Sequence, residues 1–163
     1  MADSVGLRSA PMRRAFRPMA HVALLLAGSP QGGLGSPQTW QADIQIRTLE
    51  VTRTKTSVSA RVVVYTENDD DAQNARLLIL LPVGVGIERI APICSATPGP
   101  SMVPSLRAMV TCDLGVIPNR GYREVALATS VPPNDKPRRF GVFAYSSTPD
   151  PVPGNNYAER AIP

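Results

Sequence analysis

Short segments in which every second residue is apolar limit the folds open to this chain more than any other feature. Residues 58–66 alternate in this way, and residues 75–81 repeat the pattern before Pro82 ends it. An extended strand sends successive side chains to opposite faces, so such segments predict strands with one buried face. The side chains expected to face inward are Val58, Ala60, Val62, Val64, Ala75, Leu77, Ile79 and Leu81.

Turn-forming residues divide the rest of the chain into similar segments. Further strands are expected at about residues 44–54, 86–94, 106–114, 122–131, 139–147 and 157–161, with Pro, Gly and Asn clusters at 97–100, 118–121 and 132–135,. The 17 prolines argue against long helices,. Seven or eight short strands predict an all-β fold over residues 42–163, with two sheets packed as a sandwich.

The N-terminal residues have the layout of a secretory signal. Arg13, Arg14 and Arg17 precede an apolar stretch at residues 19–28, and small or turn-forming residues follow,. We expect a leader at residues 1–28, with Met12 as a possible true start, and a flexible linker at residues 29–41. Export would follow the general secretory or the twin-arginine route, to the periplasm, the cell surface or the medium. A disordered basic tail is the alternative.

The formal charge of +4 does not indicate a nucleic-acid partner. Residues 1–41 contain four arginines and one aspartate, so nearly all of the excess lies in the leader. A nucleic-acid-binding domain would instead gather Lys and Arg on one face beside stacking aromatics. No apolar run reaches the roughly 18 residues of a spanning helix, so we expect no membrane span in the mature chain.

The chain contains two cysteines, Cys94 and Cys112. An even count in an exported protein favours a disulfide, which would restrain the Pro- and Ser-rich residues 95–105. Two buried free thiols are the alternative.

Several segments, taken in order, resemble a known family. The segments are Ala42-Asp43-Ile44, Val62-Val63-Val64-Tyr65-Thr66-Glu67-Asn68, Leu81-Pro82-Val83-Gly84, Cys94, Val110-Thr111-Cys112-Asp113-Leu114-Gly115 and Asp150-Pro151-Val152-Pro153-Gly154-Asn155-Asn156. Together they resemble the bacterial immunoglobulin-like repeat called domain of unknown function eleven, here in a single copy. The resemblance implies an immunoglobulin-like two-sheet Greek-key sandwich of seven to eight strands, secretion, a Cys94–Cys112 pair, and a spacer or interaction role without catalytic residues.

The residue types available argue against catalysis and against a cofactor. The sole histidine, His21, lies in the leader, so the processed domain would lack the imidazole of Ser-His-Asp and Cys-His sites,. No pair of carboxylates stands out as a glycosidase would require. Asp69, Asp70 and Asp71 are a weak Ca²⁺ candidate, because adjacent residues on a tight turn point apart. A solvated turn is the alternative.

The outward positions of the strands are unusually apolar. If Leu77, Ile79 and Leu81 face inward, then the outward side chains are Leu78 and Leu80, and by the same logic Val63, Tyr65, Phe143 and Tyr145. Several such residues on one sheet would form a patch that meets a protein partner or another copy. The alternative is that the segment around Trp40 or the C-terminal tail covers it.

These observations favour an exported, non-catalytic module with a structural or protein-interaction role in the cell envelope or at the cell surface. A soluble carrier or carbohydrate-binding module is the alternative. It would need an aromatic platform, for which the material is Trp40, Tyr65, Phe143 and Tyr145.

Overall fold

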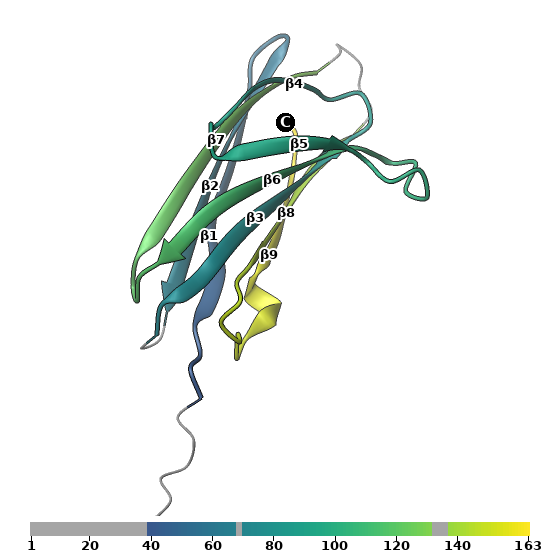
Figure 1. Ribbon diagram of the computed structural model, residues 1–163. Helices are drawn as coiled ribbons and strands as arrows, with labels where there is room; N and C mark the ends of the chain where they lie inside the picture. The colour runs from purple at the N-terminus through teal and green to yellow at the C-terminus, as the bar shows by residue number, and fades with distance from the viewer. Residues whose placement is uncertain (1–38, 68–69, 132–136) are drawn as a thin grey trace, which may run out of the picture. The chain divides into compact units, whose positions relative to one another are not determined.

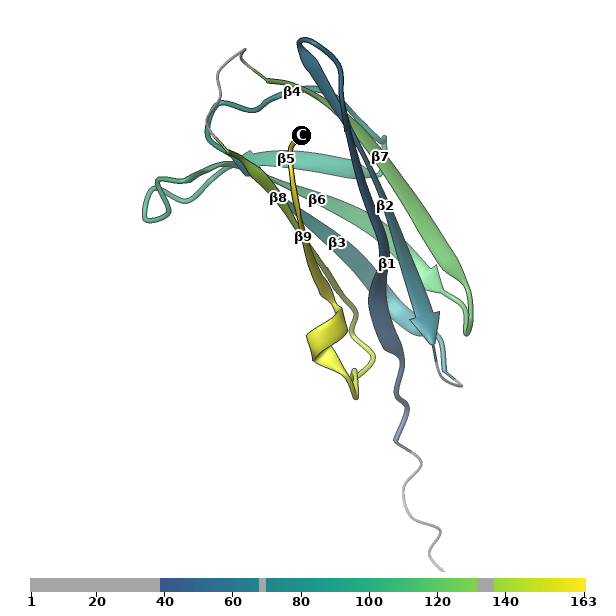
Figure 2. The same ribbon diagram turned by 180° about the vertical axis from the view of Figure 1, so that it is seen from behind.

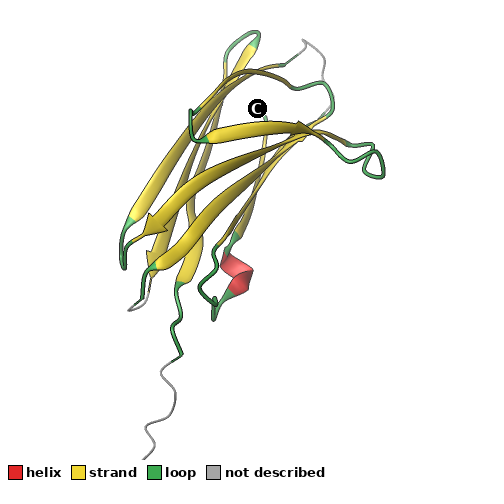
Figure 3. Ribbon diagram, viewed as in Figure 1, coloured by secondary structure: helices red, strands yellow, loops and turns green. Residues whose placement is uncertain are grey.

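The computed structural model describes residues 39–67, 70–131 and 137–163, and they form two antiparallel sheets packed face to face (Figures 1 and 3). The four-stranded sheet has the order β1 (Asp43–Arg53), β2 (Ser57–Glu67), β7 (Tyr122–Ser130) and β4 (Gly86–Ile90). The five-stranded sheet has the order β5 (Cys94–Pro98), β6 (Leu106–Ile117), β3 (Ala72–Pro82), β8 (Arg139–Tyr145) and β9 (Tyr157–Ala161). The predicted all-β immunoglobulin-like sandwich is confirmed.

Strands far apart in the chain are neighbours in both sheets. β2 pairs with β7, and β3 pairs with β8, so the chain crosses repeatedly between the layers. Figure 2 shows both sheets from behind, with the edge strands β1 and β9 side by side. This crossed connectivity is the predicted Greek-key arrangement.

The core lies between the sheets and follows the alternation of the sequence. All eight side chains predicted to face inward are at most 3% exposed. Phe140 of β8 is the largest fully buried side chain. Burial of each large apolar side chain contributes roughly 1.5–3 kcal/mol, so this double layer accounts for much of the stability of the fold.

The single strand predicted at residues 86–94 corresponds to β4, a turn and the first residue of β5, and the two strands belong to different sheets. β4 ends at Ile90, and a turn closed by the Cys94 amide donating to the Ala91 carbonyl at 2.9 Å leads into β5. Pro92 lies in that turn and has no amide hydrogen for a ladder,. β5 then occupies residues 94–98, part of which the sequence predicts as a turn. The described residues therefore hold nine strands instead of seven or eight.

The connection from β8 to β9 holds the start of β1. It contains one short 3₁₀ helix, η1 (Pro153–Asn155). The Asp150 carboxylate accepts hydrogen bonds from the amides of Ile44 at 3.1 Å and Val152 at 2.7 Å. The Asn155 amide donates to the Asp43 carboxylate at 2.8 Å. The connection between β8 and β9 thus fastens the first residues of β1.

In the part of the chain that the structure describes, no helix has both the length and the apolar character needed to cross a membrane.

Candidate interaction surface

The outer side of the five-stranded sheet carries apolar side chains on adjacent strands. Leu78 of β3 stands opposite Phe143 of β8, and Leu80 stands opposite Gly141. Leu78 and Leu80 are half-buried, whereas their neighbours Leu77 and Ile79 are fully buried. β3 therefore presents leucine to the outside as well as to the core.

Aromatic side chains continue this surface across β8 and β9. The rings of Phe143 and Tyr145 stack with their centroids 5.9 Å apart. Tyr157 of β9 stands opposite Phe143 and is 50% exposed. The sequence pattern does not single out Tyr157, because only the pairing of β9 with β8 shows which way it faces. We call Leu78, Leu80, Phe143, Tyr145 and Tyr157 the aromatic face.

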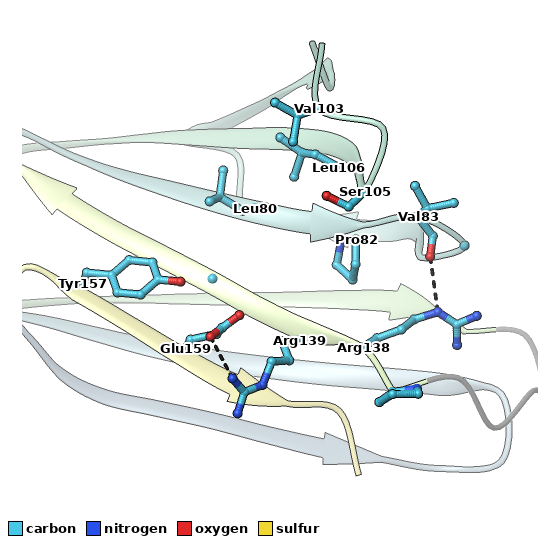
Figure 4. Close-up of a pocket in the computed structure, with 13 residues that line it drawn as sticks. Leu80, Pro82, Val83, Val103, Ser105, Leu106, Arg138, Arg139, Tyr157 and Glu159 are labelled. Carbon is cyan, nitrogen blue, oxygen red and sulfur yellow. Dashed lines mark hydrogen bonds and ion pairs between the residues drawn. The ribbon is translucent and has the colours of Figure 1, made fainter. Parts of the chain in front are cut away.

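A groove of about 710 Å³ opens at one end of the aromatic face (Figure 4). Leu80, Tyr157 and the turn after β3 line it together with Val103 and Leu106 from the other side. Gly141 gives the groove part of its depth, since a Cβ there would lie 3.3 Å from the Tyr157 hydroxyl and 3.5 Å from Leu80 Cδ1. A larger residue at this position would push into the groove.

Polar groups line the rim of the groove. Arg139 and Glu159 form an ion pair at 3.0 Å, and the Arg138 Nε donates to the Val83 carbonyl at 3.2 Å (Figure 4). Exposed pairs such as Arg139–Glu159 add little stability, typically less than about 1 kcal/mol. Apolar floor and polar rim are the usual anatomy of a protein-binding surface.

Two residues predicted for the same patch lie elsewhere. Val63 and Tyr65 belong to β2, and they face outward from the four-stranded sheet on the opposite side of the sandwich. The expectation of one shared sheet is wrong for these two residues. Alternation tells which side of a strand a residue occupies, but the sheet that the strand joins depends on long-range pairing.

The aromatic platform of the alternative function is likewise not assembled. Trp40 precedes β1 and is 68% exposed, and Tyr65 lies on the four-stranded sheet. Phe143 and Tyr145 alone share a face, where Tyr157 joins them.

Cys94 and Cys112 form a disulfide with an S–S distance of 2.04 Å. The two residues are direct partners in the pairing of β5 with β6, so the bond fastens an edge strand to its neighbour. The predicted disulfide is confirmed, and the alternative of two free thiols is wrong.

Asp69, in the acidic turn after β2, lies outside the described residues, and so does His21. Asp70 accepts a hydrogen bond from the Gln41 amide at 2.8 Å, and Asp71 accepts one from the Asn119 amide at 2.9 Å. The two carboxylates serve different neighbouring segments instead of converging. Across residues 39–67, 70–131 and 137–163, no three His, Cys, Asp or Glu side chains gather as metal ligands would.

No protein-family model matches the chain, and no curated protein matches its sequence. Solved structures resemble its fold at low identity. An uncharacterized protein from Nocardia farcinica with an immunoglobulin-like fold aligns with a TM-score of 0.42 and 12% identity, over 69% of this chain and 80% of that one. The GH20 exo-β-N-acetylglucosaminidase of Vibrio harveyi aligns with a TM-score of 0.31 and 9% identity, over 76% of this chain but 17% of the enzyme. A PapD-like domain of human CEP192 aligns with a TM-score of 0.29 and 9% identity, over 88% and 93%. These likenesses concern the fold alone.

Proposed function

We propose that this chain is an exported, non-catalytic immunoglobulin-like module that binds a protein partner through its aromatic face. Its place would be the cell envelope or the cell surface. One observation carries the proposal: the outer side of β3, β8 and β9 exposes a continuous apolar and aromatic surface beside a groove. Contiguous patches of this kind on a small soluble domain mark interaction sites.

The composition of the face favours a protein as the partner. The centres of protein interfaces are enriched in Tyr, Phe, Met and Arg and depleted of Lys and Glu. Here the face holds two tyrosines and a phenylalanine, and Met109 of β6 extends it as the cross-strand partner of Leu80. Phe143 and Tyr145 are 36% and 37% exposed, so their rings lie partly against the sheet and lose little freedom on binding,.

Export and family membership are parts of the same proposal. The leader-like residues 1–28 support export, and a disulfide is the bond expected of a protein in an oxidising compartment,. The ordered segments that resemble the bacterial immunoglobulin-like repeat support a spacer or interaction role. N-terminal sequencing of the mature protein would test export, and an N-terminus that still contains residues 13–28 would refute it.

The interaction is tested by photo-crosslinking in the native envelope. p-Benzoylphenylalanine replaces Tyr145 on the aromatic face or, as the control, Arg89 on the four-stranded sheet. We expect a discrete protein adduct from position 145 and none from position 89. The same adduct from both positions would contradict the proposal. Sedimentation velocity of the purified protein then shows whether the partner is a second copy.

A matched pair of variants separates binding from stability. Leu78→Ser combined with Leu80→Ser should abolish the adduct, and each of these half-buried leucines should lower the melting temperature less than half as much as the same change at the fully buried Leu77. Val63→Ser, a half-buried outward position on the other sheet, should leave the adduct unchanged. A large fall in melting temperature for the double variant would show that the two leucines belong to the core, which counts against the proposal.

A further inference from the structure

The outer side of the four-stranded sheet has a second depression with different chemistry. Tyr65 of β2 and Tyr122 of β7 are direct cross-strand partners, and Tyr122 is 62% exposed. Arg47 and Arg120 line the same depression, whose volume is about 490 Å³. We call these four residues the tyrosine–arginine site.

The local backbone holds both arginines in place. The pairing of β1 with β2 has a register shift between Ile46 and Thr48, and Arg47 lies at this bulge. Bulges re-aim a side chain without ending the strand. The Arg47 guanidinium lies 4.6 Å from the centre of the Tyr65 ring, a cation–π contact that holds it over the sheet,.

The turn that carries Arg120 is fixed by hydrogen bonds at three points. The Gly121 amide donates to the Pro118 carbonyl at 2.7 Å, and the Gly121 carbonyl accepts from the Thr66 amide at 3.1 Å. The Asn119 amide donates to Asp71 at 2.9 Å. Arg120 itself has a φ of 55°, which few non-glycine residues adopt,. Because the turn is ordered in advance, a ligand at Arg120 loses less entropy on binding.

Within the described residues, the charges of the two arginines are not balanced by a carboxylate. Among the described residues, Arg47 and Arg120 form no ion pair. Glu124 also lines the depression, but Arg61 engages both of its oxygens, at 2.8 and 2.7 Å. This bidentate pair lowers the pKa of the Glu124 carboxyl and balances its charge,. The depression therefore keeps the positive charge of two arginines.

From this arrangement we infer that the tyrosine–arginine site binds an acidic saccharide. A sugar ring lies on the exposed face of Tyr122, and its carboxylate accepts hydrogen bonds from Arg47 and Arg120. Tyr65 acts by positioning Arg47, since its ring supports the guanidinium. The volume of the depression falls in the range of small-ligand sites, roughly 300–1,000 Å³.

The surroundings favour a short acidic saccharide over a nucleic acid. Strands of nucleic acid follow long positively charged grooves. Here Glu50 shares Arg61 with Glu124, so that one arginine serves two carboxylates, and Glu67 accepts a hydrogen bond from the neutral Gln45 at 2.8 Å on the same sheet. These carboxylates would repel a phosphate backbone extending along β1 and β2, whereas a single carboxylate at the two arginines avoids them.

The test is isothermal titration of the full, disulfide-bonded chain with a galacturonic acid trisaccharide. The galactose trisaccharide is the neutral control, inorganic phosphate is the simple anion, and an oligothymidylate is the nucleic acid. We expect a dissociation constant near or below about 1 mM for the acidic trisaccharide. Binding should weaken as salt screens the arginines. Equal or tighter binding of any control ligand, or no heat at all, would overturn the inference.

Four variants locate the site. Tyr122→Ala and Arg120→Asn should each weaken binding, the latter roughly ten- to a hundredfold as expected for a lost hydrogen bond to a charged group. Asn also tolerates the positive φ at position 120. Tyr145→Ala and Arg160→Gln change exposed residues of the five-stranded sheet and should leave affinity unchanged. Equal losses of affinity from both pairs of variants would refute the saccharide site at Tyr122 and Arg120. The crosslinking result at Tyr145 would still stand, because it tests the proposed function separately.

Discussion

Replacing both Cys94 and Cys112 with alanine should destabilise the domain by about 3 kcal/mol. The disulfide closes a loop with a sequence separation of 18, and the loop-closure relation then gives roughly 3 kcal/mol at 25 °C,. β5 has few other restraints, since it has five residues, pairs with β6 alone, and ends at Pro98. For a domain of this size each kcal/mol corresponds to about 3–5 °C, so the melting temperature should fall by roughly 10 °C.

Urea unfolding followed by circular dichroism measures this change directly. Reductant should lower the midpoint of the wild-type protein to that of the double variant and should leave the double variant unaffected. Hydrogen exchange should show the amides of Ser95 and Thr97 losing protection first, because these residues of β5 pair with β6 and β5 is the strand that the disulfide holds,. A loss below about 1 kcal/mol would refute the loop-closure argument. So would a double variant that still responds to reductant.

Three further tests concern the core, the hydrogen bonds of Asp150 at the start of β1 and the electrostatics of the four-stranded sheet. Leu77→Ala should lower the free energy of unfolding by roughly 2–5 kcal/mol because the side chain is fully buried, and Leu78→Ala by less than half as much,. Equal losses of stability in thermal melts would contradict the assignment of Leu77 to the inner face and Leu78 to the outer face. Asp150→Ala removes two hydrogen bonds to backbone amides and should cost about 1–3 kcal/mol, with faster exchange of the amide at the start of β1,. Arg61→Gln should raise the pKa of the Glu124 carboxyl toward its ordinary value, which carboxyl NMR titration measures. Because the folded-state pKa is lowered, the stabilising effect of the pair is present above the unfolded pKa and disappears as the pH falls through the folded pKa. The stability difference between Arg61→Gln and the wild type should therefore shrink in acid, and a constant difference would count against the pairing.

Alternation predicts the facing of residues well because it is a local property of the strand. Leu77 and Leu78 are adjacent in sequence, and the pattern alone places one inside and the other outside. The same pattern cannot tell that Tyr65 and Phe143 lie on opposite sides of the sandwich, since β2 and β8 join different sheets. Sheet assignment depends on contacts between segments far apart in the chain.

The features of the two proposed sites that the sequence pattern misses depend on such distant contacts. Tyr157 joins Phe143 because β9 returns to pair with β8. Arg120 lines the same depression as Tyr65 because its turn accepts a hydrogen bond from Thr66 near the end of β2. The groove at Gly141 exists because a residue without a side chain lies between Leu80 and the Tyr157 hydroxyl. The sequence shows the glycine but not its neighbours.

The edges of the sandwich explain why its faces are the better candidates for binding. An open edge strand recruits another strand through unpaired backbone groups. Here β5 is short, disulfide-bonded and ends at Pro98, which has no amide hydrogen to offer,. β4 has a register shift between Ile87 and Arg89, and β1 has one between Ile46 and Thr48, so neither presents a regular ladder,. Strand addition is therefore disfavoured at three of the four edges. We therefore assign the proposed protein partner and the proposed acidic saccharide to side chains on the two outer faces, whose chemistry differs.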